Sequence, residues 1–254
     1  MKLLSGKKIL ITGITNKMSI AYGIAKTMHE HDAILSFTYQ NIKIKNKIKK
    51  LTKEFKSTLL INCDVTSDTS IKKLFLTLSK KWNTFDCIVH SIAYSPNYQL
   101  YGSYIDSINR NDFQTVHDIT SYSFVALAKY GINYLNSGSS LITISYLGSQ
   151  RAIQNYNIMG VAKASLESNV RYMSKDLGPM NIRVNAISSG PIKTISSSCI
   201  KNFRRVFSDN ASNSPLRKNV TIKDIGNVAV FLSSNLSSSI TGQIIYVDGG
   251  FSII

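Results

Sequence analysis

Short runs of β-branched and apolar residues alternate with helical patterns along the whole chain, and this alternation constrains the fold more than any other feature. The strand patterns cover residues 8–12, 34–39, 59–61, 87–89, 141–145, 183–187 and 243–247. Strands joined by helical crossovers run parallel, and a parallel sheet is covered on both faces. The sequence therefore predicts an α/β fold: a doubly wound, seven-stranded, mainly parallel sheet with helices on both faces.

Helices are predicted between these strands, over residues 20–31, 71–82, 113–134, 156–177 and 222–232. Another helix is indicated by Ile44, Ile48, Leu51 and Phe55, whose spacing places them on one helical face. No internal repeat, low-complexity segment or Pro-rich linker divides the chain. We therefore expect residues 1–254 to form a single domain.

Composition narrows the class of protein. Of the 254 residues, 43% are hydrophobic, too many for a disordered chain, and no apolar run is long enough to span a bilayer or resembles a secretion signal. The net charge of +16 comes mostly from scattered lysines, without a basic stripe interleaved with aromatic residues. The three cysteines and four histidines show no disulfide or metal-ligand spacing. We expect a cytoplasmic protein that binds no metal, no membrane and no nucleic acid.

Ligands of an open parallel sheet bind beyond the carboxyl ends of the strands, so the residues after each strand are informative. Gly13 follows the first strand and permits a tight turn. Ser19 can cap the next helix and direct its hydroxyl and free N–H groups at a pyrophosphate. The segment lacks the full G-x-G-x-x-G pattern, so by itself it is as typical of an ordinary strand–turn–helix junction as of a cofactor loop.

The next three strands also end in residues suited to a dinucleotide. Gln40 can hydrogen-bond an adenosine ribose, and with neither an acid nor an arginine at this point it favours NADH over NADPH, although Lys43 and Lys45 are close in sequence. Asp64 can either accept a hydrogen bond from adenine or cap the following helix. Small residues within 90–93 would let a cofactor lie against the backbone.

A tyrosine and a lysine seven residues apart give the sharpest signal. Tyr156 and Lys163 are separated by nearly two helical turns and so share one face of a helix. A cation beside a phenol lowers the pKa of the phenol from about 10, which makes it a better proton donor. Such a spacing also arises by chance, but this pair follows the fifth strand of a nucleotide-binding pattern.

Together the motifs resemble those of the bacterial enoyl-acyl carrier protein reductases, a divergent branch of the short-chain dehydrogenases/reductases. The resemblance covers essentially the whole chain and rests on Ser19-Ile20-Ala21-Tyr22-Gly23, Phe37-Thr38-Tyr39-Gln40, His117-Asp118-Ile119, Ser145-Tyr146-Leu147-Gly148, Tyr156 to Lys163, Ser189-Gly190-Pro191-Ile192 and Val247-Asp248-Gly249-Gly250-Phe251-Ser252. The Tyr-x6-Lys spacing discriminates, because ordinary short-chain dehydrogenases resemble one another in carrying Tyr-x3-Lys with an upstream catalytic serine.

This resemblance implies a Rossmann-type reductase that uses NADH to reduce trans-2-enoyl thioesters on acyl carrier protein during fatty-acid elongation. It implies that Tyr156 donates to the thioester oxygen and that Lys163 holds the nicotinamide ribose. Tyr146 is implied as a second tyrosine of the site, either the proton source or an acyl-positioning group. The implied cofactor contacts are Gly13, Ser19, Ile20, Gln40, Asp64, Val65, Ile92, Lys163, Ile192, Lys193, Thr194, Ile195 and Ser196, and Ser95 is implied in the acyl pocket.

The segment after Pro191 is expected to move and to carry a docking site. Residues 192–207 begin with small polar side chains and are predicted to form a mobile loop that closes over nicotinamide and substrate. Lys201, Arg204 and Arg205 fall at i, i+3 and i+4, which predicts one basic helical face. That face is either only solvated or, as the resemblance implies, docks the acidic acyl carrier protein. The resemblance also implies a homotetramer, for which the apolar segment 244–254 offers an interface.

Two other functions stay open from the residues alone. One is a short-chain reductase that acts on a carbonyl such as a 3-oxoacyl thioester, which the Tyr-x6-Lys spacing disfavours. The other is a non-catalytic protein that binds NAD or uses its positive charge to bind nucleic acid. The two tyrosines and the lysine disfavour that second alternative.

Overall fold

Seven strands form one sheet in the computed structural model, which describes residues 2–57 and 59–254. The strands are β1 (Lys8–Thr12), β2 (Ile34–Tyr39), β3 (Leu59–Asn62), β4 (Phe85–His90), β5 (Leu135–Tyr146), β6 (Arg183–Ser189) and β7 (Ile244–Val247). Their order is β3-β2-β1-β4-β5-β6-β7, and every neighbouring pair is parallel. The predicted doubly wound fold is confirmed, with a sheet that is wholly rather than mainly parallel over the described residues.

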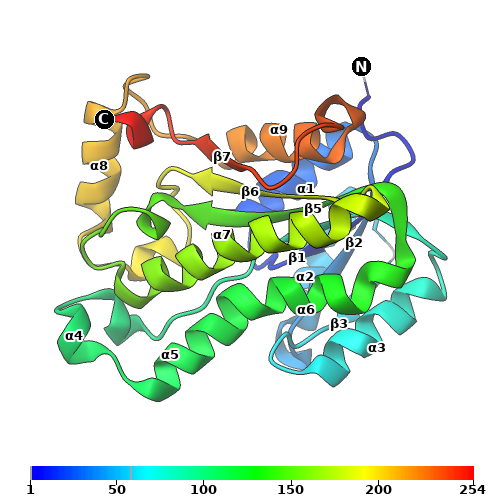
Figure 1. Cartoon of the computed structure of the whole chain (residues 1–254), viewed down its shortest axis with the longest axis horizontal. Coiled ribbons are helices and arrows are strands. Elements are labelled where there is room, and N and C mark those ends of the chain that lie inside the picture. Colours follow the sequence, from blue (N-terminus) through cyan, green and yellow to red (C-terminus); the bar gives the residue numbers. More distant parts are fainter. Residues whose placement is uncertain (1, 58) are drawn as a thin grey trace.

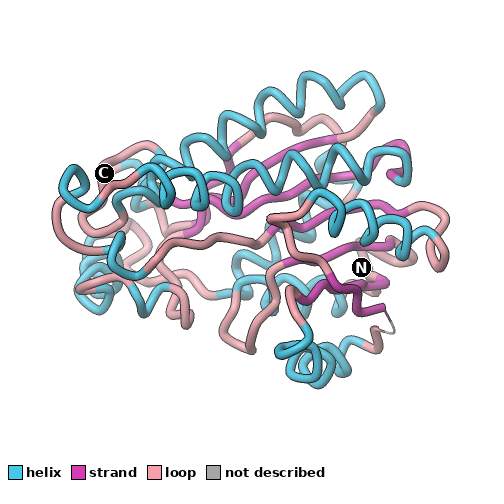
Figure 2. The backbone as a smooth tube through the Cα atoms, turned by 90° about the horizontal axis from the view of Figure 1, so that it is seen from below, coloured by secondary structure: helices cyan, strands magenta, loops and turns pink. Residues whose placement is uncertain are grey.

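Helices cover both faces of this sheet (Figure 1). One face packs against α1 (Ile20–Glu30), α2 (Ile42–Thr52) and α9 (Ile222–Ser233), and the other against α3 (Asp68–Ser79), α6 (Ser123–Gly131) and α7 (Asn157–Leu177). In Figure 2 the strands run side by side, with helices lying across them. Successive strand residues serve opposite layers, since Ile9 and Ile11 pack with α1 whereas Leu10 packs with α3. No helix among the described residues has the length and hydropathy needed to cross a membrane.

The single helix predicted over residues 113–134 is wrong. The structure has three successive elements there: α5 (Arg110–His117), a π-helical turn (Asp118–Tyr122) and α6 (Ser123–Gly131). At this turn the Ser123 hydroxyl donates to the Ile119 carbonyl at 2.7 Å, and the Thr120 hydroxyl reaches the backbone of Tyr94. Side-chain hydroxyls thus bond the backbone where the helical ladder changes, and apolar periodicity does not reveal such a change.

Two short segments complete the end of the molecule where the strands finish. They are α4 (Tyr104–Ser107) and α8 (Phe203–Asn213). In Figure 1 both lie at the same end, beyond the carboxyl ends of β5 and β6. The sheet reverses its strand order between β1 and β4, so this end is also where a ligand is expected.

Candidate active site

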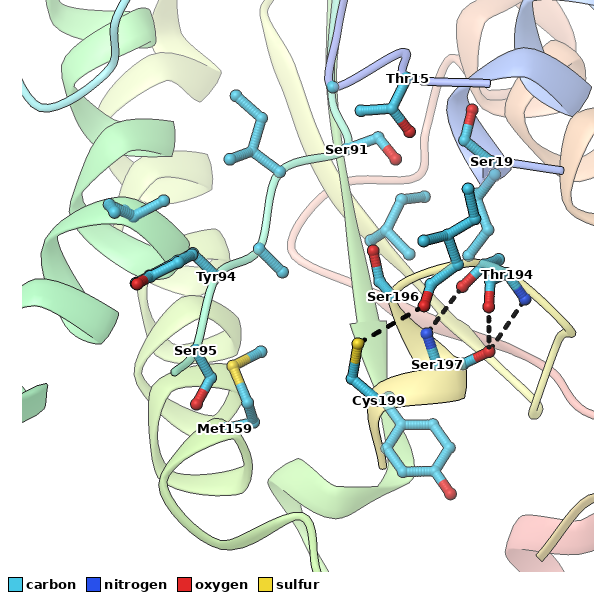
Figure 3. A pocket seen from close by; sticks show the side chains of 18 of the residues that line it. Thr15, Ser19, Ser91, Tyr94, Ser95, Met159, Thr194, Ser196, Ser197 and Cys199 are labelled. Atoms are coloured by element: carbon cyan, nitrogen blue, oxygen red, sulfur yellow. Dashed lines mark hydrogen bonds between the residues drawn. The ribbon is translucent and has the colours of Figure 1, made fainter. Parts of the chain in front are cut away.

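A cavity of about 880 Å³ opens where the strands end. Its walls are formed by residues that follow β1, β2, β3, β4 and β6, by the end of β5 and by the first half of α7. Figure 3 shows Ser91, Tyr94 and Ser95 on one wall, and Thr194, Ser196 and Ser197 on another. Segments far apart in the sequence therefore meet around one space, at the position where open α/β sheets bind ligands.

The junction of β1 and α1 is shaped for close approach of an anion. Gly13 has a φ of +84°, and a Cβ there would lie 1.9 Å from the carbonyl oxygen of Ser91. Ser19 is the N-cap residue of α1, but its hydroxyl donates to the Asn16 carbonyl at 2.7 Å, so the predicted side-chain cap is wrong. The first turn of α1 has no acidic residue, and Ser19 and Ile20 at the start of this helix line the cavity. This arrangement fits a pyrophosphate.

Gln40, Asp64 and Val65, which follow β2 and β3, line the cavity. Asp64 accepts hydrogen bonds from the backbone and hydroxyl of Thr66, at 3.1 and 2.8 Å. Ser67 caps α3, so the alternative role of Asp64 as the helix cap is wrong.

Two lysines follow Gln40, but neither is among the described residues that line the cavity. These are Lys43 and Lys45, and the ammonium of Lys45 lies 5.7 Å from the ring centroid of Tyr39.

Tyr146, Tyr156 and Lys163 come together on the cavity wall. Tyr146 ends β5, Tyr156 is the N-cap residue of α7, and Lys163 lies nearly two turns further along that helix. The two phenol rings meet edge to face with centroids 4.8 Å apart. The Lys163 ammonium is buried and donates to the Ile144 carbonyl at 2.6 Å. The structure therefore brings the three predicted catalytic side chains into one cluster.

Burial dominates the electrostatics of this cluster. It raises the pKa of Tyr156, and the charges of Tyr146 and Glu167 raise that pKa further. The prediction that Lys163 lowers the pKa of Tyr156 is therefore wrong: spacing identifies the neighbouring cation but not the loss of solvent around the phenol. Burial likewise lowers the pKa of Lys163 to about 8, against the opposing effect of Glu167. At neutral pH the cavity wall thus carries a neutral Tyr156 phenol and a Lys163 ammonium.

Part of the wall was not predicted from the sequence. The additional lining residues include Tyr94, Asn97, Leu100, Met159, Ile200, Phe203 and Val206. Met159 could have been found, because it lies three residues after Tyr156 and four before Lys163 on the same helical face. The others come from loops and from α8, where no periodic pattern indicates which side chains face the cavity.

The segment after β6 forms a second wall. Ile192, Thr194, Ile195 and Ser196 line the cavity as expected, together with Ile92 and Ser95 across from them. Lys193 is not among the described residues that line the cavity, and its ammonium lies 4.5 Å from the ring centroid of Phe207.

Hydrogen bonds fold this segment back on itself. The Ser197 hydroxyl donates to the Ile192 carbonyl at 2.8 Å and accepts from the Thr194 amide at 2.9 Å.

The three basic residues beside this wall do not share one helical face. Asn202 has a φ of +61°, and α8 begins after it at Phe203, so Lys201 precedes the helix while Arg204 and Arg205 lie on its first turn. The single basic face predicted for them is wrong because the left-handed residue interrupts the helical spacing. All three side chains are nevertheless exposed near the cavity mouth.

Comparison with known proteins gives consistent matches. The family model for Enoyl-(Acyl carrier protein) reductase matches residues 13–252. Enoyl-[acyl-carrier-protein] reductase [NADH] FabI of Buchnera aphidicola subsp. Baizongia pistaciae (strain Bp) is 55% identical, over 100% of this chain and 97% of that protein. The protein of the same name from Escherichia coli (strain K12) is 52% identical over the same shares.

Solved structures agree with these sequence matches. The crystal structure of enoyl-[acyl-carrier-protein] reductase (NADH) from Aquifex aeolicus VF5 has a TM-score of 0.96 at 41% identity, covering 99% of this chain and 98% of that one. The reductase of Anaplasma phagocytophilum in complex with NAD has a TM-score of 0.96 at 37% identity, covering 99% and 96%. With matches of this extent in both sequence and structure, the chain belongs to the enoyl-acyl carrier protein reductase family.

Proposed function

We propose that this chain is an NADH-dependent enoyl-acyl carrier protein reductase, which reduces the trans-2 double bond of enoyl thioesters during fatty-acid elongation. The observation that carries the proposal is the cluster of Tyr146, Tyr156 and Lys163 on the wall of a cavity with a Gly13 turn and a helix N-terminus suited to a pyrophosphate. A carbonyl reductase is disfavoured by the seven-residue spacing, and a non-catalytic role by the clustering itself.

NADH supplies, when bound, the hydride that adds to the β-carbon of the substrate. The residues proposed to hold it are Gly13, Ser19, Ile20, Gln40, Asp64, Val65, Ile92, Lys163, Ile192, Thr194, Ile195 and Ser196, all of which line the cavity. Lys193 follows Ile192 in the chain and stays a predicted contact, with its ammonium 4.5 Å from the ring centroid of Phe207. Gln40 offers an adenosine ribose a neutral hydrogen-bonding group, which supports the preference for NADH.

The proposed chemistry depends on a donor that is in place before the reaction. Negative charge develops on the thioester oxygen as the double bond is reduced, and the neutral phenol of Tyr156 donates a hydrogen bond to it. One such preorganised donor is worth about 3 kcal/mol of transition-state stabilisation. Lys163 binds ribose hydroxyls and keeps the local potential positive. Tyr146 packs against Tyr156 and either delivers the proton or positions the acyl chain, with Ser95 on the facing wall.

Substitution of the two α7 residues separates catalysis from cofactor binding. Tyr156→Phe is expected to lower kcat about 10²- to 10³-fold with an unchanged Kd for NADH, because only the donor is removed. Lys163→Ala is expected to raise the Kd for NADH, because a ribose contact is removed. The measurements are loss of NADH absorbance with crotonyl- and dodecenoyl-carrier substrates, with NADPH for comparison, and NADH binding by fluorescence titration. Full activity in both variants would contradict the mechanism.

We further propose that residues 192–207 move to close over nicotinamide and substrate, and that Lys201, Arg204 and Arg205 dock acyl carrier protein. The short polar wall of 192–199 and the exposed cations lie next to each other at the cavity mouth, which supports both assignments. Opposite charges steer and orient a carrier more than they tighten its binding.

Reversing these three charges to glutamate is expected to raise KM about tenfold for carrier-bound substrate and to leave an acyl-CoA analogue nearly unaffected. The control reverses Lys73, Lys80 and Lys81, which lie on α3 or just after it, at the opposite end of the molecule from α8 (Figure 1). Steady-state kinetics with both substrates decide the matter: equal losses with carrier and CoA substrates would argue against docking.

We also propose that the chain forms a homotetramer in the cytoplasm, with residues 244–254 at an interface. Support comes from β7, which is an edge strand, and from the exposed side chains of Ile253 and Ile254 just beyond it. An unpaired strand edge followed by exposed apolar side chains is a surface suited to association.

A further inference from the structure

Glu167 is a buried carboxylate for which the mechanism above gives no role. It lies on α7, one helical turn after Lys163, with only 4% of its surface exposed. Its Oε1 accepts hydrogen bonds from the hydroxyls of Ser145 at 2.5 Å and Ser149 at 2.6 Å. A carboxylate this deeply buried is costly unless it is hydrogen-bonded and paired with a cation, so its partners indicate what it does.

The two serines flank the turn that supports both catalytic tyrosines. Ser145 directly precedes Tyr146 at the end of β5, and Ser149 ends the short helix that follows. Between them, a Cβ on Gly148 would lie 2.4 Å from the ring of Tyr156, so this ring rests directly on the turn. By holding both ends of the turn, the Glu167 carboxylate fixes the surface against which the tyrosines pack.

The same carboxylate lies one helical turn from the proposed catalytic lysine. Positions four apart on a helix are neighbours, and the charge of Glu167 opposes the effect of burial on the pKa of Lys163. In the sheet beneath, Ser145, Ser188 and Tyr246 are register neighbours on β5, β6 and β7, and neighbours in register share one face. The Ser188 hydroxyl is buried without a hydrogen-bond partner among the described residues. Glu167 thus lies over a polar row of the sheet.

Other titratable groups around this pair come from every neighbouring element. They are Tyr156 on α7, Tyr146 on β5, His90 on β4, and Tyr246 on β7 with Asp248 and Arg151 beside it. Lys163 helps to lower the pKa of His90, while Glu167 helps to raise the pKa of Tyr246, after burial in both cases. Among these groups, Glu167 is the carboxylate whose charge acts on the Lys163 ammonium.

We propose that Glu167 is a positioning residue of the active site: it holds the turn 145–149 beneath Tyr146 and Tyr156 and places a carboxylate one helical turn from Lys163, where the ribose binds. This inference rests on the proposed function, since it assigns how the residues of that site are held in place. It adds a residue that touches neither substrate nor cofactor.

Glu167→Gln tests the proposal because it keeps the shape of the side chain and removes its charge. The pKa of Lys163 is expected to fall by about one unit or more, and the alkaline limb of the kcat/KM profile is expected to move to lower pH by the same amount. The pKa is read in the protein without NADH from the ¹³Cε resonances of labelled lysines, with the Lys163 signal assigned by Lys163→Arg. Glu167→Asp, which retains the charge, is expected to restore most of the wild-type pKa.

Asp176→Asn is the matched control, because it removes one exposed carboxylate from the same helix, and it should leave both readouts unchanged. An unchanged Lys163 pKa and pH profile in Glu167→Gln would overturn the proposal. The two proposals can fail separately. If the wild-type protein does not reduce enoyl substrates, the proposed function is overturned. If the Lys163 pKa nevertheless falls in Glu167→Gln, the role of Glu167 is supported.

If Glu167→Gln does not fold, Ser149→Ala decides instead. This substitution removes the hydrogen bond from the half-buried Ser149 hydroxyl to the Glu167 carboxylate. We expect kcat to fall severalfold and the melting temperature to stay within a few degrees of the wild-type value. A wild-type kcat in Ser149→Ala would then overturn the proposal.

Discussion

Two glycines leave the space that the Tyr156 side chain occupies. A Cβ at Gly148 would lie 2.4 Å from Cδ1 of the Tyr156 ring and 3.2 Å from the ring of Tyr146. A Cβ at Gly160 would lie 2.6 Å from the Gly148 carbonyl oxygen. The distances of 2.4 and 2.6 Å are below those of real contacts, so either added methyl group would force the turn or the ring to move.

Gly148→Ala is therefore expected to lower kcat about 10²-fold, because a displacement of about 1 Å at a reacting group has a cost of that order. Gly178→Ala is the control, since a Cβ there meets open space. Kinetics with an enoyl-carrier substrate and circular dichroism separate lost positioning from lost folding. A Gly148→Ala enzyme with wild-type kcat would show that the ring tolerates the shift.

For single residues, the sequence predicted which side chains line the cavity but not how burial shifts their pKa values. Tyr156, Lys163, Gln40 and Asp64 were found because each follows a strand or repeats at helical spacing. The raised pKa of Tyr156 was missed, because desolvation depends on every neighbour at once. Glu167 was missed because its partners lie 22 and 18 residues earlier, on another element.

His90 joins three elements behind the cavity. Its Nδ1 lies 2.8 Å from the Thr143 hydroxyl of β5, and its Nε2 lies 2.8 Å from the Ser123 hydroxyl of α6. Because the Ser123 hydroxyl donates to the Ile119 carbonyl, it can accept from Nε2–H, which leaves Nδ1 to accept from Thr143. Burial, with a smaller effect of Lys163, lowers the pKa of His90 to about 3. The neutral ring thus links β4 to β5 and α6 through hydrogen bonds.

This burial predicts a pH dependence of stability. As pH falls below about 6.5, the unfolded chain protonates His90 while the folded chain does not until about pH 3, so stability is lost on acidification across that window. The slope from this one group is about 1.4 kcal/mol per pH unit. His90→Gln is expected to be less stable than wild type at pH 7.5 but to lose less free energy of unfolding between pH 6.5 and 4.5. Urea unfolding measures both, and parallel pH curves would refute the assignment.

Among the elements, α1, α7 and α9 lie within one residue of their predicted bounds, whereas β5 begins six residues before its predicted start at 141. β2 matches its predicted bounds, because the run from Ile34 to Tyr39 is rich in β-branched and aromatic residues and is followed by the polar Gln40 and Asn41. The break between α5 and α6 was missed, since it depends on hydroxyls that bond backbone carbonyls and a neighbouring loop. The start of α8 was misplaced for a similar reason, because the conformation of Asn202 is local and leaves no periodic trace.

For the molecule as a whole, β3 and β7 are the edge strands of the sheet over residues 2–57 and 59–254, and the β7 edge carries the proposed interface. Arg151 holds the segment beyond β7 by donating to the carbonyls of Ser252 and Ile254, each at 2.6 Å. Ile253 is 80% exposed beside these bonds. An exposed apolar side chain on a backbone held in place by hydrogen bonds favours contact with a partner surface.

Ile253→Glu is therefore expected to shift the assembly from four chains toward smaller species, because a charge would be desolvated at the interface. Leu236→Glu is the control, since Leu236 is 62% exposed on a different segment. Sedimentation velocity at micromolar concentration gives the result. A wild type that sediments as a single chain, or an Ile253→Glu variant that keeps four, would contradict the interface.

The fold class followed from the alternation of strand and helix patterns, because crossover connections permit few other arrangements. The net charge of +16, by contrast, did not identify a partner. What distinguishes Arg204 and Arg205 from the other cations is their place at the cavity mouth, beside Phe203 and Val206, and only the folded chain shows this.

The cavity wall runs in sequence from Gly13 to Val206, and β1 pairs with both β2 and β4. During translation the first strand is thus exposed without its second neighbour until β4 has left the ribosome, and the last part of the wall emerges much later. A dinucleotide therefore finds no complete site on the nascent polypeptide until the chain has emerged as far as Val206, and it stabilises this fold only after that point.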